Sequence, residues 1–300
     1  MSMWLIAIIL AYLFFSLSSL GDKLILSGKP KPKAYTFYVG LIGLSVFLFI
    51  PFMELRLPSK GLLIWIIAEA IIYLLALYTM FSAVKKFEIS KVAVTIGAVQ
   101  PIFIFILTWF VWKDQRMSAI HILAFILLLI GSIIISLEKN YQSTKGYLKI
   151  TLFTAFLFSV DYVLMKFIFL TEPFLLGLFW MRIIAVLFAL VLLLSKNTRH
   201  EIFSKQSFLN KKIISLMAFT YTAGGAANIL QAFAISLTPV ALLPILNSLR
   251  GMQYIFLFLI TLFFSIFFPK ILKEEISKRI IFQKITAIIL IAGGLAILVY

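Results

Sequence analysis

The sequence predicts an all-α polytopic membrane protein with ten transmembrane helices, arranged as two inverted five-helix repeats. Three observations support this fold: the hydropathy of the chain, a weak internal repeat and the distribution of basic residues. Of the 300 residues, 63% are hydrophobic and only 13% are charged, and the mean hydropathy is +1.12. Because soluble domains carry about 25% charged residues, this composition indicates a chain solvated by lipid.

Ten apolar runs are long enough to cross a bilayer, which takes about 20 residues. The first run starts at Met3 with no basic residue before it and no small-residue cleavage site, so we expect a retained helix rather than a signal peptide. The connections are too short for a separate soluble domain, so function is expected among the helices. The predicted spans are residues 3–26, 35–54, 61–83, 89–112, 117–137, 147–170, 173–195, 212–236, 239–268 and 279–300.

The second half of the chain weakly repeats the first. The stretch SLSSLGDKL, which starts at Ser16, overlays SVDYVLMKF, which starts at Ser159. Near the ends of the halves, LLLIGSIII resembles ILIAGGLAI. We therefore predict two domains, residues 1–140 with helices one to five and residues 145–300 with helices six to ten. Because five is odd, the second half starts from the opposite side of the membrane, and the repeats are inverted.

The basic residues give an independent test of this inversion. Most of the 27 Lys and Arg residues fall in the odd-numbered loops, for example in the loop that starts at Lys196. Equivalent loops of the two halves therefore carry opposite charge bias, as inversion requires. By the positive-inside rule, the odd-numbered loops are cytoplasmic and both termini lie outside. We expect the inner membrane of a prokaryotic cell as the location.

The composition also excludes several classes of function. The chain has no cysteine and only two histidines, so we predict no metal centre and no cofactor. The net charge of +16 lies mostly in short loops between apolar runs, which marks membrane topology rather than a nucleic-acid surface. We find no P-loop and neither HExxH nor DDxxD. The sequence therefore predicts a protein that is not an enzyme.

Four ionisable residues lie near the centres of predicted spans. An ionised side chain there costs about 2.5–3.5 kcal/mol on insertion scales, so such residues normally face the bundle interior or a watered cavity. Two readings stay open: these residues pair off and hold the halves together, or they line a substrate path. The four are Glu69 in helix three, Asp161 in helix six, Arg182 in helix seven and Arg250 in helix nine.

Further polar residues share helix faces with them, because residues three, four or seven apart lie on one side of a helix. In helix nine, Asn247 and Tyr254 align with Arg250, and Tyr73 aligns with Glu69 in helix three. Polar stripes on several helices indicate a shared cavity. The predicted substrate-binding residues are Glu69, Tyr73, Gln100, Asp161, Arg182, Asn228, Asn247, Arg250 and Tyr254.

The prolines and lysines within the spans can be explained by helix geometry and by the membrane interface. Pro101, Pro239 and Pro244 either kink their helices or break them and expose backbone groups. Lys23 and Lys166 lie close to helix ends, where a buried stem lets the ammonium group reach the interface.

These positions resemble the ten-helix EamA-like branch of the drug/metabolite transporter superfamily, and the resemblance covers nearly the whole chain. Each half of such a protein tends to open with a small-Trp-Gly pattern followed by a Lys. Here Phe-Ser replaces Trp-Gly in both halves, and the lysines are Lys23 and Lys166. Other matches are Arg182 early in helix seven, Pro101 within helix four, and Gly131 and Gly293 near the ends of the halves. Family members are expected to have cytoplasmic termini, which differs from the charge pattern here.

We therefore predict a secondary transporter, or permease, that moves a small polar metabolite by alternating access. An acid and an Arg at mid-membrane suit a zwitterion, with Arg250 or Arg182 accepting the carboxylate. Asp161 or Glu69 would then accept the amine or a coupling proton. The resemblance implies amino acids and related metabolites, with export as the usual direction.

Two alternatives stay open at this point. An anionic solute such as a sugar phosphate or nucleotide sugar would use Arg182, Arg250 and Lys166 together. From another class, the chain would be a non-transporting membrane scaffold or a membrane enzyme. The expected partners are the small-molecule substrate and the lipid bilayer, and the sequence makes no prediction about oligomeric state.

Overall fold

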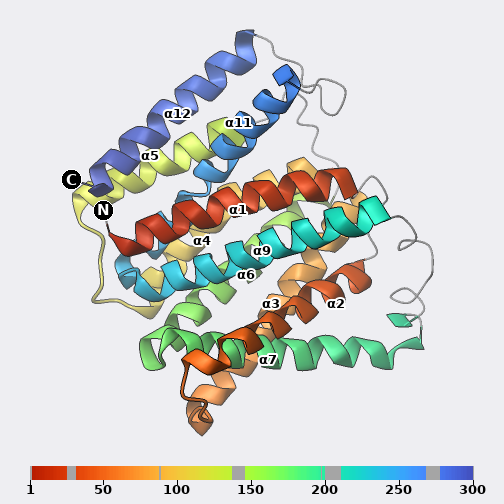
Figure 1. The fold of residues 1–300 in the computed structure, drawn as a ribbon. Coiled ribbons are helices and arrows are strands. Elements are labelled where there is room, and N and C mark those ends of the chain that lie inside the picture. Colours follow the sequence, from red (N-terminus) through yellow and green to blue (C-terminus); the bar gives the residue numbers. More distant parts are fainter. Residues whose placement is uncertain are drawn as a thin grey trace.

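The computed structural model of this protein describes residues 2–25, 32–87, 89–136, 146–196, 198–199, 211–267 and 278–299. Within these ranges the chain forms helices and no strands, which confirms the predicted all-α polytopic fold (Figure 1). The first helix begins and the last helix ends at the same end of the bundle (Figure 1), as an even number of crossings requires.

The helices agree with the predicted spans to within a few residues. The first half contains α1 (Met3–Ile25), α2 (Pro32–Ile42) continued by the 3₁₀ helix η1 (Gly43–Phe52), α3 (Lys60–Lys86), α4 (Ile89–Val111) and α5 (Ala119–Ser136). The second half contains α6 (Tyr147–Thr171), α7 (Phe174–Val191) continued by η2 (Leu192–Leu194), α9 (Lys211–Leu237), η4 (Val240–Leu242), α10 (Leu243–Ser248), α11 (Gly251–Phe267) and α12 (Lys278–Val299).

In the part of the chain that the structure describes, nine helical segments are long and apolar enough to cross a membrane. The helix outside this set is α9, which has 27 residues and therefore ample length. Its middle is more polar, because it contains Asn228, Gln231 and the adjacent Gly224 and Gly225. It packs against α1 and α6, so its polar residues have protein neighbours.

Contacts between the two halves come in matching pairs. Helix α1 packs on α9 and α11, and α6 packs on α3 and α4. Helices α5 and α12 pack on each other along one edge of the bundle (Figure 1). Every one of these contacts joins an element of the first half to one of the second. The predicted boundary between residues 140 and 145 lies outside the described residues, so the division into two domains stays a prediction.

Glycines allow α5 and α12 to approach closely, which is a common device in membrane helix pairs. A Cβ atom on Gly131 would lie 2.7 Å from Ile291 Cγ1, and one on Gly294 would lie 2.7 Å from Leu128 Cγ. A Cβ atom on Gly293, which the family resemblance matches to Gly131, would have no neighbour within 4 Å. The close contact is therefore made by Gly294, one residue further along.

The predicted ninth span over residues 239–268 is one candidate membrane crossing, Val240–Phe263, but its helix is interrupted within this range. Helix α10 ends at Ser248 and α11 begins at Gly251. The Arg250 amide donates to the Asn247 carbonyl at 3.0 Å, and the Gln253 amide donates to the Arg250 carbonyl at 2.9 Å. These i to i+3 bonds tighten the chain into a 3₁₀-like turn. The break therefore falls at Arg250 and not at Pro244, which lies in the first turn of α10.

Candidate functional site

Buried polar side chains of the membrane-spanning helices gather in two clusters that meet at α6. We name them the acid cluster and the tyrosine cluster, after their most distinctive members. Neighbouring residues of α6, Asp161 and Tyr162, belong to one cluster each. The acid cluster consists of Glu69, Tyr73, Asp161 and Arg182. The tyrosine cluster consists of Tyr12, Tyr162, Asn247, Arg250 and Tyr254.

The acid cluster lies between α3, α6 and α7. Glu69 is fully buried, and Asp161 and Arg182 are 6% and 9% exposed. Arg182 Nη1 lies 3.9 Å from Glu69 Oε1, and the guanidinium carbon lies 4.6 Å from the centre of the Tyr73 ring, within the range of a cation–π contact. Asp161 interacts electrostatically with both Glu69 and Arg182. The cluster thus joins an acid of the first half to an acid and a base of the second.

The polar atoms of the acid cluster are poorly satisfied. Among the described residues, both carboxylate oxygens of Glu69, Oδ1 of Asp161 and Nη1 of Arg182 have no hydrogen-bond partner. A separation of 3.9 Å exceeds the 2.7–3.2 Å of an N–H···O hydrogen bond. One guanidinium charge faces two carboxyl groups, so the groups do not form a closed set of ion pairs. Burying an unpaired charge is costly, which points to a role other than simple bracing.

The tyrosine cluster surrounds the break between α10 and α11. The Tyr12 hydroxyl on α1 donates to the carbonyls of Leu246 and Asn247, at 3.2 and 3.4 Å. The Ser132 hydroxyl on α5 donates to the Ser248 carbonyl at 2.7 Å. Because a broken helix leaves carbonyls without their usual donors, buried partners are required at membrane depth. Two helices of the first half supply those partners to a helix of the second.

Arg250 lies in the break and is half-buried. A Cβ atom on Gly97 of α4 would lie 2.6 Å from the Tyr254 hydroxyl and 3.0 Å from Arg250 Cδ, so glycine leaves room for both side chains. The Tyr254 hydroxyl donates to the Ala93 carbonyl at 3.3 Å. Within the described ranges no carboxylate pairs with Arg250.

Several other donors around Arg250 also lack a partner. Asn247 is fully buried, and neither its amide nitrogen nor its amide oxygen has a hydrogen-bond partner in the described part of the chain. The same holds for the Tyr162 hydroxyl and for Nε of Arg250. A cation, an amide and a phenol gathered at a helix break form a set of donors suited to an anion.

The comparisons with known proteins agree with this architecture. A family model described as the EamA-like transporter family matches residues 2–137. The first half of this chain is therefore similar to that family. The match is to a family of transporters, in agreement with the prediction that the chain is not an enzyme. With nine candidate spans in the part of the chain that the structure describes, the protein is a multi-pass membrane protein, and its first half is similar to a family of transporters.

The other comparisons concern the fold. Matches were found to 28 chains of solved structures. One of them, described only as the crystal structure of a protein, has a TM-score of 0.65 and 17% sequence identity over 97% of this chain and 94% of its own. At that identity the likeness shows the fold alone. No curated protein matched the sequence.

Seven of the nine predicted site residues lie in the two clusters, and the remaining two lie outside them. Gln100 on α4 binds α6 instead: its amide donates to the Phe158 carbonyl at 3.4 Å, and the Ser159 hydroxyl donates to the Gln100 carbonyl at 3.1 Å. Asn228 donates to the Gly224 carbonyl of its own helix at 2.8 Å. Gln100 therefore positions α6, and no described contact joins Asn228 to either cluster.

Lys166 does not reach the membrane interface, so that expectation is wrong. Its side chain is 3% exposed, and Nζ donates to the carbonyls of Ile235 and Ser236 at 3.2 and 3.0 Å. These carbonyls end α9, where a cation is favoured by the helix dipole. Lys166 is therefore a cap for α9.

Two members of the tyrosine cluster were not predicted, Tyr12 and Tyr162. Both are almost fully buried. Tyr162 follows Asp161 directly in the sequence, and Tyr12 lies four residues before Ser16, where the repeat begins. A tyrosine in an apolar run is common in membrane helices, so only the three-dimensional contacts distinguish these two.

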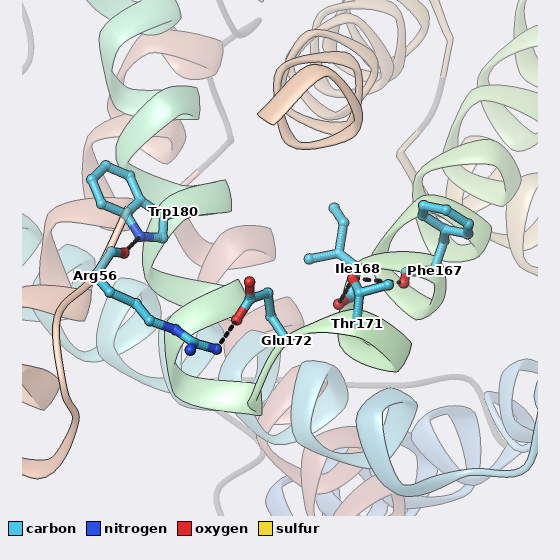
Figure 2. A network of polar contacts seen from close by, with 6 residues as sticks. All are labelled: Arg56, Phe167, Ile168, Thr171, Glu172 and Trp180. Carbon is cyan, nitrogen blue, oxygen red and sulfur yellow. Dashed lines mark hydrogen bonds and ion pairs between the residues drawn. The ribbon is translucent and has the colours of Figure 1, made fainter. Parts of the chain in front are cut away.

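Another polar contact between the halves lies nearer the surface, in the turn between η1 and α3 (Figure 2). Arg56 Nη2 lies 2.8 Å from Glu172 Oε2, at the end of α6. The Trp180 ring nitrogen on α7 donates to the Arg56 carbonyl at 2.8 Å. Figure 2 also shows Thr171 donating to the carbonyls of its own helix. This network joins the turn before α3 to α6 and α7 of the second half.

Proposed function

We propose that this EamA-like protein is a secondary transporter that works by alternating access. Its substrate is a small carboxylate-bearing metabolite, an amino acid or related zwitterion. The observation that carries the proposal is Arg250, a half-buried cation at a helix break without an acidic partner among the described residues. Carboxylates bind arginine through charge-assisted hydrogen bonds. Asn247 and Tyr162 stand beside it with donors to spare.

The same geometry supports Arg250 over Arg182 as the carboxylate ligand. Arg182 already faces Glu69 at 3.9 Å and the ring of Tyr73, whereas Arg250 faces tyrosines. An ammonium group beside Arg250 would meet phenol oxygens and ring faces, which attract cations. A zwitterion therefore suits the tyrosine cluster without any help from the acids.

A doubly charged phosphate is a poorer fit. The sugar-phosphate alternative requires Arg182, Arg250 and Lys166 to act together. Arg182 is in the acid cluster, and Lys166 donates to two carbonyls of α9. Among the described residues, Arg250 has no acidic partner and its Nε has no hydrogen-bond partner, which suits a single carboxylate.

Alternating access would use the paired contacts between the halves. Helix α6 packs on α3 and α4, and α1 packs on α9 and α11, so a rocking motion of one half against the other would pass through both clusters. We propose export as the direction and, from the positive-inside rule, a prokaryotic inner membrane with both termini outside. Labelling a Ser2→Cys variant in intact cells with an impermeant maleimide would test the orientation, since the chain has no other cysteine.

Counterflow in proteoliposomes tests the transport function. Liposomes with purified protein are loaded with unlabelled amino acids, one pool at a time, and given a trace of labelled solute. We expect accumulation with at least one pool, and a loss of about 10- to 100-fold in apparent affinity for Arg250→Gln, because a charged hydrogen bond contributes about 1.5–3 kcal/mol. Arg116→Gln, at an exposed loop position, is the matched control. A signal with phosphate esters alone, or an unaffected Arg250→Gln, would contradict the proposal.

A further inference from the structure

We propose that Glu69 and Asp161 together hold one exchangeable proton. This proton site is separate from the substrate site at Arg250, and movement of the proton drives transport of the substrate. The proposal rests on the transport function above. Its structural basis is the acid cluster: two buried carboxyl groups, one guanidinium group at 3.9 Å and unpartnered carboxyl oxygens.

The charge count requires one additional positive charge. Glu69 comes from α3, Asp161 from α6 and Arg182 from α7, and among the described residues the other titratable group that faces them is Tyr73. Two carboxylates and one guanidinium would leave a net negative charge on buried side chains. Such a charge is strongly disfavoured when buried, and one bound proton makes the cluster neutral.

The ligand is a proton rather than a metal ion. Calcium takes six to eight oxygen ligands and magnesium six, whereas two carboxyl groups supply four oxygens. In the described residues no group of three or more acidic, histidine or cysteine side chains is close enough to hold a metal. The guanidinium of Arg182 also stands 3.9 Å from Glu69, where it would repel a second fixed cation.

Helix α6 connects this proton site to the substrate site. Asp161 faces the acid cluster and its neighbour Tyr162 faces Arg250. The neutral cluster is compatible with the closed packing, and the deprotonated cluster is compatible only with a state that admits water. A proton therefore favours one conformation of the transporter over the other, and this differential binding is what coupling requires.

The proposal is tested with one protein preparation and two transport assays. Counterflow at equal pH reports exchange of a labelled amino-acid mixture, and uptake driven by a pH gradient reports coupling. We expect Asp161→Asn and Glu69→Gln to keep counterflow and to lose accumulation driven by the pH gradient. Asp114→Asn, which alters an exposed loop acid outside both clusters, should keep both activities. Retained gradient-driven accumulation in Asp161→Asn, or wild-type accumulation driven by sodium in place of a pH gradient, would overturn the proposal.

A second measurement needs no substrate and separates this proposal from the transport function. Infrared spectroscopy of the purified wild-type protein at neutral pH should show the carbonyl band of a buried, neutral carboxylic acid. The band should disappear in the Glu69→Gln/Asp161→Asn double variant. Absence of the band from the wild type would overturn the proton site even if counterflow succeeds. Failure of counterflow with every amino acid would contradict the substrate at Arg250 and leave the infrared result decisive for the proton.

Discussion

The contact of α6 with α3 and the contact of α1 with α9 occupy matching places in the two halves, but they are built from opposite kinds of residue. At the first contact, Glu69 and Asp161 meet in the acid cluster. At the second, Ser18 takes the place that the sequence overlay gives to Asp161, and a Cβ atom on Gly224 would lie 3.0 Å from its hydroxyl oxygen. A Cβ atom on Gly21 would collide with Thr220 Oγ1.

This difference shows how a duplicated architecture divides its tasks. Small residues let α1 and α9 approach closely, which stabilises helix pairs in a membrane. The acids at the α3 contact are costly to bury in a membrane, and in our proposal they hold the coupling proton. We therefore expect substitutions at the α1 contact to change stability, and neutralisation of the acids at the α3 contact to change transport.

The largest effect is expected when the base of the acid cluster is removed. In Arg182→Gln, Glu69 and Asp161 lose the guanidinium that partly compensates them, and breaking such a buried set costs about 3–5 kcal/mol. Thermal unfolding in detergent would measure the loss. The Arg182→Gln/Glu69→Gln double variant should regain most of it, because the charge balance is restored. Wild-type stability of the single variant would show that these charges do not interact strongly.

A smaller loss of stability is expected at the opposite contact. Gly21→Ala places a methyl group on Thr220 Oγ1, and overpacking of this kind costs about 1–3 kcal/mol. Thr220→Ala should rescue it in the double variant. Gly61→Ala is the matched control, because a Cβ atom at Gly61 has no neighbour within 4 Å. Equal unfolding temperatures for the two single variants would contradict the close packing of α1 on α9.

Neutralising one acid of the acid cluster should not lower the free energy of unfolding, in contrast to the two variants above. Asp161→Asn keeps the volume and removes an uncompensated carboxyl group, so we expect a free energy of unfolding between unchanged and about 1 kcal/mol higher, since replacing buried ionic groups is often neutral or stabilising. The same thermal unfolding experiment decides this. A destabilisation as large as that of Arg182→Gln would mean that Asp161 braces the fold.

The sequence predicts the membrane spans well, but it predicts poorly which side chains contact one another, and the reasons are physical. A helix in lipid is marked by a run of about 20 apolar residues, a signal long enough to place α1 or α12 to within a few residues. The burial of Glu69 and Asp161 also follows from the cost of an exposed charge. The break at Arg250 does not, because it depends on hydroxyl groups of Tyr12 and Ser132 that come from distant helices.

Lys166 illustrates the same limit. Its place near a helix end predicts an ammonium group at the interface, but the last carbonyls of α9 lie within reach and bind it instead. Spacing along one helix fixes which residues share a face, and it does not fix which neighbour that face meets. For this reason the sequence predicted one shared cavity, where the structure shows two clusters that meet at α6.

The smallest effect on stability, with a large effect on transport, is expected at the surface pair of Arg56 and Glu172. The Arg56 side chain is 63% exposed, so neutralising it should change the free energy of unfolding by about 0–1 kcal/mol. The pair nevertheless joins the turn before α3 to the end of α6 (Figure 2), and alternating access requires such contacts between the halves to open on one side in turn.

A reversible cross-link separates these two consequences. The chain has no cysteine, so Arg56→Cys/Glu172→Cys reacts with a short bifunctional thiol reagent at these positions alone. We expect counterflow to stop on cross-linking and to return when the linker is cleaved, because the halves can no longer separate there. Arg116→Cys/Glu172→Cys, treated in the same way, controls for modification without this link. Full counterflow in the cross-linked protein would mean that the two halves keep this contact throughout the transport cycle, and that the acid cluster acts while this end of the bundle stays closed.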